Sequence, residues 1–191
     1  MKYDEIINQE NFDLPLSFKR FLSINNQHNR FGQSWGNYVH AYHRAFEVMA
    51  RHMLENPIRN QCVTIPLFYL ARHSMELALK ETLLGFSDSG IQAVKAEGHN
   101  LLTLYDELLK VLKDNGVSDE QWSIHCHKII VHLNKADPNG ENFRYPEALN
   151  RKVFPEVEVD IEGLIRAHHH VTLLSDCVAT MLDEQRFHES F

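Results

Sequence analysis

Apolar residues recur at steps of three and four positions in five separate segments of this 191-residue chain. That spacing places them on one face of an α-helix. It predicts helices over residues 34–55, 64–85, 100–115, 118–136 and 160–186. No segment shows the alternation of apolar and polar residues that is typical of a strand. The sequence therefore predicts an all-α, antiparallel helical bundle of about five helices.

Residues that favour helix ends mark these bounds. Ser34 is expected to cap the first helix and Asn100 to open the third. Residues 118–121, Ser-Asp-Glu-Gln, form a capping box at the start of the fourth helix. Pro57 and Gly85 follow helical patterns that they are expected to end.

Two long segments lie outside the predicted helices. Residues 1–33 mix Asn, Gln, Asp and Ser with short apolar clusters, and they predict an N-terminal arm that packs on a bundle domain over 34–191. Residues 137–158 form a long irregular connection, in which the valines of 153–159 favour a short extended stretch. A structureless loop of that length is unusual in a compact domain, so we expect this one to be ordered and functional.

Composition narrows the classes of function. Apolar residues make up 43% of the chain and the formal net charge is −7. No run of Lys and Arg exceeds two residues, so a role with nucleic acid requires a local basic cleft. The chain has no apolar run long enough to span a bilayer and no apolar signal segment. Its three cysteines have no paired spacing, which suits a reducing compartment, and the sequence predicts a cytoplasmic protein.

Three short motifs occur in a characteristic order. The second predicted helix carries Arg72, Glu76 and Lys80, residues 98–101 read Gly-His-Asn-Leu, and residues 143–146 read Phe-Arg-Tyr-Pro. Over residues 35–186 this order resembles the HEPN superfamily of prokaryotic helical domains. The resemblance implies a four-helix core, a homodimer, and a place in a toxin, antiphage or RNA-processing system.

The resemblance also directs attention to an Arg–His pair near the last helix. Active ribonucleases of that family carry an Arg and a His separated by four to six residues, whereas here three residues separate Arg166 from His170. One helical turn apart, both side chains can face the same groove. A histidine would then move the proton of the 2′-hydroxyl group of RNA, while an arginine stabilises the charged phosphorane. The alternative is an exposed helix face, with His168 as a hydrogen-bonded histidine at the edge of the core.

The ladder Arg72, Glu76 and Lys80 has two interpretations. At positions i, i+4 and i+8 the three side chains can form two ion pairs, with Asp137 or Arg144 as an outside partner. The ladder would then be a structural clamp that holds the loop of 143–146 on the bundle. Alternatively the ladder, with Arg144 and Tyr145, lines a polar pocket that binds a phosphate or a nucleotide.

Other chemistry finds little support in the sequence. The thirteen histidines match no zinc-binding pattern, and no phosphate-binding or dinucleotide-binding loop occurs, so we predict no metal and no cofactor. Cys126 stands between His125 and His127, which makes it a candidate for a lowered thiol pKa.

Two functions remain open at this point. The first is a HEPN-like domain of a bacterial defence or toxin–antitoxin system, which binds RNA or cleaves it without a metal as a homodimer. In that case Arg166 and His170 form the reactive pair. The second is a catalytically inactive helical module that dimerises or binds a partner protein.

Overall fold

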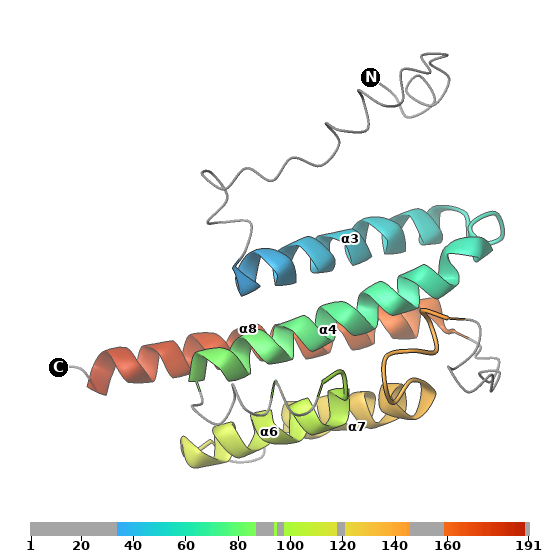
Figure 1. The fold of residues 1–191 in the computed structure, drawn as a ribbon. Helices are drawn as coiled ribbons and strands as arrows, with labels where there is room; N and C mark the ends of the chain where they lie inside the picture. Colours follow the sequence, from blue (N-terminus) through green and yellow to red (C-terminus); the bar gives the residue numbers. More distant parts are fainter. Residues whose placement is uncertain (1–33, 87–93, 95–97, 118–120, 146–158, 190–191) are drawn as a thin grey trace, which may run out of the picture. The chain divides into compact units, whose positions relative to one another are not determined.

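Five α-helices make up most of the chain that this computed structural model describes, which comprises residues 34–86, 94, 98–117, 121–145 and 159–189. The helices are α3 (Trp35–Glu55), α4 (Thr64–Phe86), α6 (Leu101–Asp114), α7 (Gln121–Ala136) and α8 (Ile161–Glu189), and a 3₁₀ turn, η2 (Gln61–Val63), precedes α4. No strand occurs in these residues, so the predicted all-α bundle is confirmed (Figure 1).

Some predicted features lie outside the described residues. They are the arm of residues 1–33, the capping-box residues 118–120, and the extended stretch of 153–158. The described helices belong to one compact unit, Ser34–Phe191. None of the helices in the described part is both long enough and apolar enough to cross a membrane.

Polar side chains cap the first turns of α3 and α6. The Ser34 hydroxyl accepts a hydrogen bond from the N–H group of Asn37 at 3.2 Å. The Asn100 side chain accepts one from the N–H group of Thr103 at 3.1 Å, ahead of α6. Each cap satisfies a backbone donor that has no partner within its own helix. The predicted starts at Ser34 and Asn100 are therefore confirmed.

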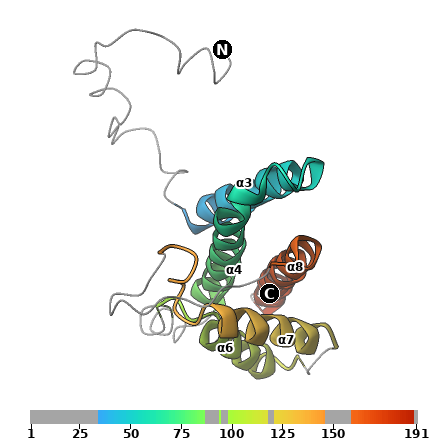
Figure 2. The same cartoon turned by 90° about the vertical axis from the view of Figure 1, so that its right-hand side faces the viewer.

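Helix α4 occupies the centre of the bundle. Figures 1 and 2 show α3 on one side of α4 and the α6–α7 pair on the other, while α8 lies alongside it. Helices α4 and α8 run in the same direction, because Ser74 contacts His168 and Thr82 contacts the carbonyl of Ser175. Helix α4 is buried along most of its length. It therefore carries apolar residues on several faces, which is typical of a central helix.

The hydrophobic core extends over all five helices. The largest of its fully buried apolar side chains are Leu67, Met75, Leu79, Leu83, Leu101, Leu104, Tyr105, Leu108, Ile130 and Val171. The hydroxyl of Tyr105 donates to the carbonyl of Ser123 at 2.8 Å, which satisfies the one polar atom of its side chain and ties α6 to α7.

His168 is a polar residue within this core. Its Nε2 lies 3.0 Å from the hydroxyl of Ser74, and its ring centroid lies 4.0 Å from that of Phe46. Burial, followed by the charges of His43 and His169, lowers the pKa of His168 to about 3. The histidine is therefore neutral in the folded protein, and it joins α3, α4 and α8.

We expect the stability of the bundle to fall in mild acid because of His168. Its folded-state pKa of about 3 lies below the unfolded value near 6.5, so only the unfolded state gains the proton between these values. Between pH 6.5 and pH 5 the free energy of unfolding should fall by about 2 kcal/mol more in the wild type than in a His168→Gln variant. Urea unfolding at the two pH values measures this difference. If the free energy of unfolding fell equally in both proteins, this pH dependence would not arise from His168.

Candidate functional site

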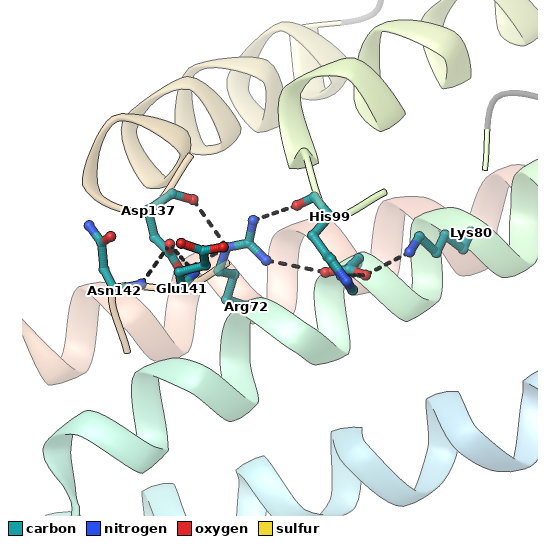
Figure 3. A network of polar contacts seen from close by, with 7 residues as sticks. Arg72, Lys80, His99, Asp137, Glu141 and Asn142 are labelled. Atoms are coloured by element: carbon teal, nitrogen blue, oxygen red, sulfur yellow. Dashed lines mark hydrogen bonds and ion pairs between the residues drawn. The ribbon is translucent and has the colours of Figure 1, made fainter. Parts of the chain in front are cut away.

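A buried ladder of charged side chains follows one face of α4 (Figure 3). Nη1 of Arg72 donates to Oε2 of Glu76 at 3.2 Å, and Nζ of Lys80 donates to Oε1 of Glu76 at 2.7 Å. The side chains of Arg72 and Glu76 are only 2% and 1% exposed. The two ion pairs that the sequence spacing predicts are therefore formed, and both lie in the interior.

Two residues outside α4 complete the network. Nε of Arg72 donates to the backbone carbonyl of Asp137 at 3.3 Å and lies 3.2 Å from Oδ2 of the same residue, an ion pair without hydrogen-bond geometry. Nη2 of Arg72 donates to the carbonyl of His99, whose Nδ1 lies 2.8 Å from Oε1 of Glu76. Of the two outside partners considered from the sequence, the structure selects Asp137.

Asp137 also organises the loop that follows α7. Its Oδ1 accepts the N–H groups of Glu141 at 2.8 Å and Asn142 at 3.1 Å, and the Asn142 amide donates to the carbonyl of Ala136. Figure 3 shows Glu141 and Asn142 around the Asp137 carboxylate, beside the Arg72 guanidinium group. The carboxylate of Asp137 therefore joins the end of α7, the loop and the buried ladder.

The charges within the network balance. Arg72 and Lys80 supply two positive charges, and Glu76 and Asp137 supply two negative ones. Burial acts to raise the pKa of Glu76, but the hydrogen bonds and charges of Lys80 and His99 outweigh it and hold the pKa below its usual value. The inaccessible guanidinium group and the balanced charges favour the structural clamp. A phosphate-binding role for Arg72, Glu76 and Lys80 stays a prediction.

Gly140 lies directly against the clamp, in the left-handed region at φ +75°. A Cβ atom there would approach Nη1 of Arg72 to 2.8 Å. Gly140→Ala should therefore lower the free energy of unfolding through both backbone strain and displacement of the guanidinium group, by about 2–4 kcal/mol in all. Gly116→Ala is the matched control, because Gly116 has φ +76° and open space around it. Equal losses in urea unfolding would show that contact with Arg72 adds nothing.

Arg144 and Tyr145 lie beside the clamp but do not join it through a hydrogen bond or ion pair within the described residues. The Arg144 guanidinium carbon lies 5.2 Å from the ring centroid of Tyr69, a cation–π contact on α4. The Tyr145 side chain is exposed. The preceding residue, Phe143, stacks on Phe68 with ring centroids 3.7 Å apart. This loop is therefore held on α4 by aromatic packing and, through Asp137, by the clamp.

The structure gives Arg166 and His170 separate partners. Nη2 of Arg166 lies 3.4 Å from Oε2 of Glu162 on the exposed surface of α8. Nδ1 of His170 lies 3.0 Å from Nε2 of His125, which belongs to α7. The predicted pair thus stands one turn apart on α8, and His170 is joined by a second imidazole that the sequence analysis did not assign to the site.

The contact between His125 and His170 determines how many protons the two rings hold. Two imidazoles at hydrogen-bonding distance share one proton between the facing nitrogens, and a second proton is disfavoured by like charge. Partial burial, and then the charges of His125 and His169, lower the pKa of His170 from its usual value. A neutral His170 is therefore available as a proton acceptor near neutral pH.

Cys126 does not have the lowered pKa that its neighbours in the sequence suggested. Its thiol is buried and donates to the carbonyl of His170 at 3.5 Å. Burial raises the thiol pKa to about 11, because His125 and His127 project away from it on other sides of α7. Cys126 is therefore a packing residue between α7 and α8, and the lowered pKa for which the sequence made it a candidate is not found.

The part of the chain that the structure describes contains no group of three or more His, Cys, Asp or Glu side chains arranged to hold a metal ion. Comparison of the chain with protein-family models, with curated proteins and with solved structures finds no match. The candidate site therefore rests on its own geometry, which comprises a buried clamp on α4 and an exposed imidazole pair between α7 and α8.

Proposed function

We propose that this chain is a HEPN-like domain that binds RNA and cleaves it without a metal ion, as a homodimer, in a bacterial defence or toxin–antitoxin system. The pair of imidazoles between α7 and α8, with nitrogens 3.0 Å apart, is the observation that carries the proposal. Arg166 stands one helical turn from His170 on α8. The biological setting follows from the order of the sequence motifs that resemble the HEPN superfamily.

The two histidines divide the proton transfers of RNA cleavage. His170, with Nδ1–H donating to Nε2 of His125, accepts the proton of a 2′-hydroxyl group at its Nε2, and the 2′-oxygen then bonds to the adjacent phosphorus. The bond from phosphorus to the 5′-oxygen breaks, and His125 donates its Nδ1 proton to that oxygen while its Nε2 takes the shared proton from His170. The products are a 2′,3′-cyclic phosphate and a 5′-hydroxyl end. The facing nitrogens lie 3.0 Å apart, so the shared proton returns from His125 to His170 when water removes the proton on Nε2 of His170 and supplies one to Nδ1 of His125, which restores the starting state.

Arg166 supplies positive charge for the phosphorane. Its guanidinium group is exposed and bound to Glu162 by a single long contact of 3.4 Å. Exposed ion pairs of this kind contribute only about 0.5 kcal/mol, so a phosphate can displace the Glu162 carboxylate at little cost. Arg166 would then act as the electrostatic stabiliser of the developing negative charge.

Exposed apolar side chains close to the imidazole pair in the sequence support the proposed homodimer. Ile124, which directly precedes His125, is 46% exposed, and Leu173, one turn after His170, is 37% exposed. A second copy that covers these side chains would also bring a second set of Arg166 and His170 to the same surface. Two copies would thereby place two Arg166 guanidinium groups near the phosphate, whereas a single Arg166–His170 pair supplies only one.

The same apolar side chains favour a second candidate function, an inactive module that dimerises or binds a partner protein. In that case Ile124 and Leu173 are interface residues, and the neighbouring histidines add polar contacts at its rim. The two functions differ in one respect that can be measured, because only the first requires His170 for a chemical reaction.

The test is incubation of the purified full chain, in EDTA, with end-labelled tRNA and mRNA. We expect cleavage by the wild type and by an Arg51→Ala/His188→Ala control, whose two residues are exposed and distant in sequence from the pair. An Arg166→Ala/His170→Ala variant should be inactive, and activity per chain should fall on dilution below the dimer dissociation constant. Equal inactivity of all three proteins, with a dimer still present by light scattering, would favour the interaction module.

A further inference from the structure

A cavity of about 480 Å³ opens between α7 and α8, and its described lining includes Phe68 of α4. This volume lies within the range of small-molecule binding sites. Phe68, Leu133 and Leu164 belong to the hydrophobic core, so the fold itself holds these lining side chains in place. Neither Arg166 nor His170 is among the described lining residues, so the cavity lies outside the reaction centre proposed above.

The lining of the cavity changes from buried apolar side chains to exposed charged and polar ones. Phe68, Leu133 and Leu164 are buried, whereas Lys128 and His132 are exposed. The apolar side chains therefore form the floor of the cavity, and the polar ones stand at its mouth. A ligand that matches this gradient has an apolar body and a polar head group that stays near water.

The floor offers aliphatic surface without hydrogen-bonding groups. Ile129, Leu133 and Leu164 line it, and their side chains neither donate nor accept hydrogen bonds. Phe68 is the one phenyl ring among the described lining residues, and one of its faces is already stacked on Phe143, with ring centroids 3.7 Å apart. A polar ring would lose its hydrogen bonds to water here without replacement. An alkyl chain has no such bonds to lose and is stabilised by leaving water.

The mouth carries a cation that has no partner. His125, Lys128 and His132 stand at i, i+3 and i+7, which places them on the cavity side of α7. The Lys128 ammonium and the His132 imidazole form no hydrogen bond or ion pair with the residues that the structure describes. An ammonium group has three donors and binds carboxylate oxygens through charge-assisted hydrogen bonds. The mouth therefore favours an anionic head group.

Asp160 limits the charge of that head group. It is the one acidic side chain among the described lining residues. Its Oδ1 accepts the N–H group of Gly163 at 3.0 Å, and a Cβ atom at Gly163 would approach its Oδ2 to 2.5 Å. The carboxylate is therefore held against the first turn of α8, where the positive end of the helix favours it. One lysine and one aspartate at the mouth suit a singly charged carboxylate better than a doubly charged phosphate.

We propose that this cavity binds a medium-chain fatty carboxylate, with the head group at Lys128 and the alkyl chain over Ile129, Leu133 and Leu164. The inference goes beyond the RNA chemistry proposed above and does not depend on it, because neither the ligand contacts nor their test involve RNA. His125 lines the cavity and also contacts His170, so the bound ligand lies beside the imidazole pair.

Binding to the full-length protein is measured by isothermal titration calorimetry with hexanoate, octanoate and decanoate. Each added methylene group should tighten binding by about three- to fourfold, because it buries further apolar surface. Decanol and decylamine have the same alkyl chain as decanoate but lack its negative charge. Both should bind at least about tenfold more weakly than decanoate, since Lys128 forms a charge-assisted hydrogen bond with the carboxylate alone.

The first pair of variants tests the mouth. Lys128→Ala should weaken decanoate binding by about tenfold and leave decanol binding unchanged. Lys135→Ala is the matched control, since Lys135 is an exposed lysine on α7 that is not among the cavity's described lining residues. Binding of decanoate to this control should equal binding to the wild type.

A second pair of variants tests the apolar floor. Ala167→Leu adds a larger side chain to the cavity from α8, whereas Ala179→Leu makes the same change at a half-buried position of the same helix that is not among the described lining residues. Only Ala167→Leu should weaken decanoate binding. Circular dichroism should show the helical content of the wild type in both variants.

The location of the ligand is measured by nuclear magnetic resonance of the histidine rings. Decanoate should shift the ring signals of His125 and His132, which line the cavity, and leave those of the exposed His188 in place. Unmoved signals of His125 and His132 would overturn the proposal. It would equally be overturned by the absence of saturable decanoate binding, by an affinity independent of chain length, or by equal effects of the cavity and control variants.

Discussion

Glu76→Gln is expected to lower the free energy of unfolding by about 3–5 kcal/mol, because it removes the shared partner of two buried ion pairs. The change removes one negative charge and leaves the shape of the side chain nearly unaltered. Arg72 and Lys80 would then lose their shared carboxylate; Arg72 would keep its ion pair with Asp137, and Lys80 would lose the one ion pair that it forms with the described residues. Urea unfolding followed by circular dichroism at pH 7 measures the loss.

Glu81→Gln is the matched control for this prediction. Glu81 is on the same helix, but burial and the charge of Asp176 raise its pKa, and its carboxylate forms no ion pair with the residues that the structure describes. Removing that charge should change the free energy of unfolding by no more than about 0.5 kcal/mol. If Glu76→Gln and Glu81→Gln had the same effect, the clamp would not be the stabilising feature that we describe.

The second large effect concerns His170. If this side chain is the proton acceptor, His170→Ala should reduce the rate of RNA cleavage by a factor of about 10²–10⁴. The wild-type rate should fall at acidic pH as His170 is protonated, at a pH below the ordinary histidine value because the pKa of His170 is lowered. That acidic limb should disappear from the residual activity of the variant.

His188→Ala serves as the control for this measurement, because His188 is an exposed histidine near the end of the same helix. The rate of RNA cleavage by the His188→Ala variant, and the dependence of that rate on pH, should match those of the wild type. An unchanged acidic limb in the His170→Ala variant would assign the titration to another residue and remove His170 from the mechanism.

Helix periodicity predicted the fold well because a helical bundle depends on local spacing. The starts at Ser34 and Asn100 and the five helices follow from patterns within a few residues of each position. Burial was harder to predict. Trp35 and Tyr38 share the helical spacing of buried Phe46, yet they are 42% and 51% exposed, since spacing identifies a face but not the neighbour that covers it.

The site was predicted only in part, because local spacing does not identify partners from distant parts of the chain. The contacts of Glu76 with Arg72 and Lys80 lie one turn apart and follow from sequence, whereas the partners that complete the network come from His99 and Asp137, far along the chain. No pattern in the sequence indicates which distant residues will meet. The contact between His125 and His170 spans 45 positions and depends on how α7 packs against α8.

We propose that the imidazole pair performs metal-independent transesterification of RNA. The most direct measurement is mass spectrometry of the RNA ends formed in EDTA by the wild type and by a His125→Ala/His170→Ala variant of confirmed helical content. We expect 2′,3′-cyclic phosphate and 5′-hydroxyl ends from the wild type alone. The absence of these ends from the wild-type reaction, or their equal yield from the variant, would contradict the claim.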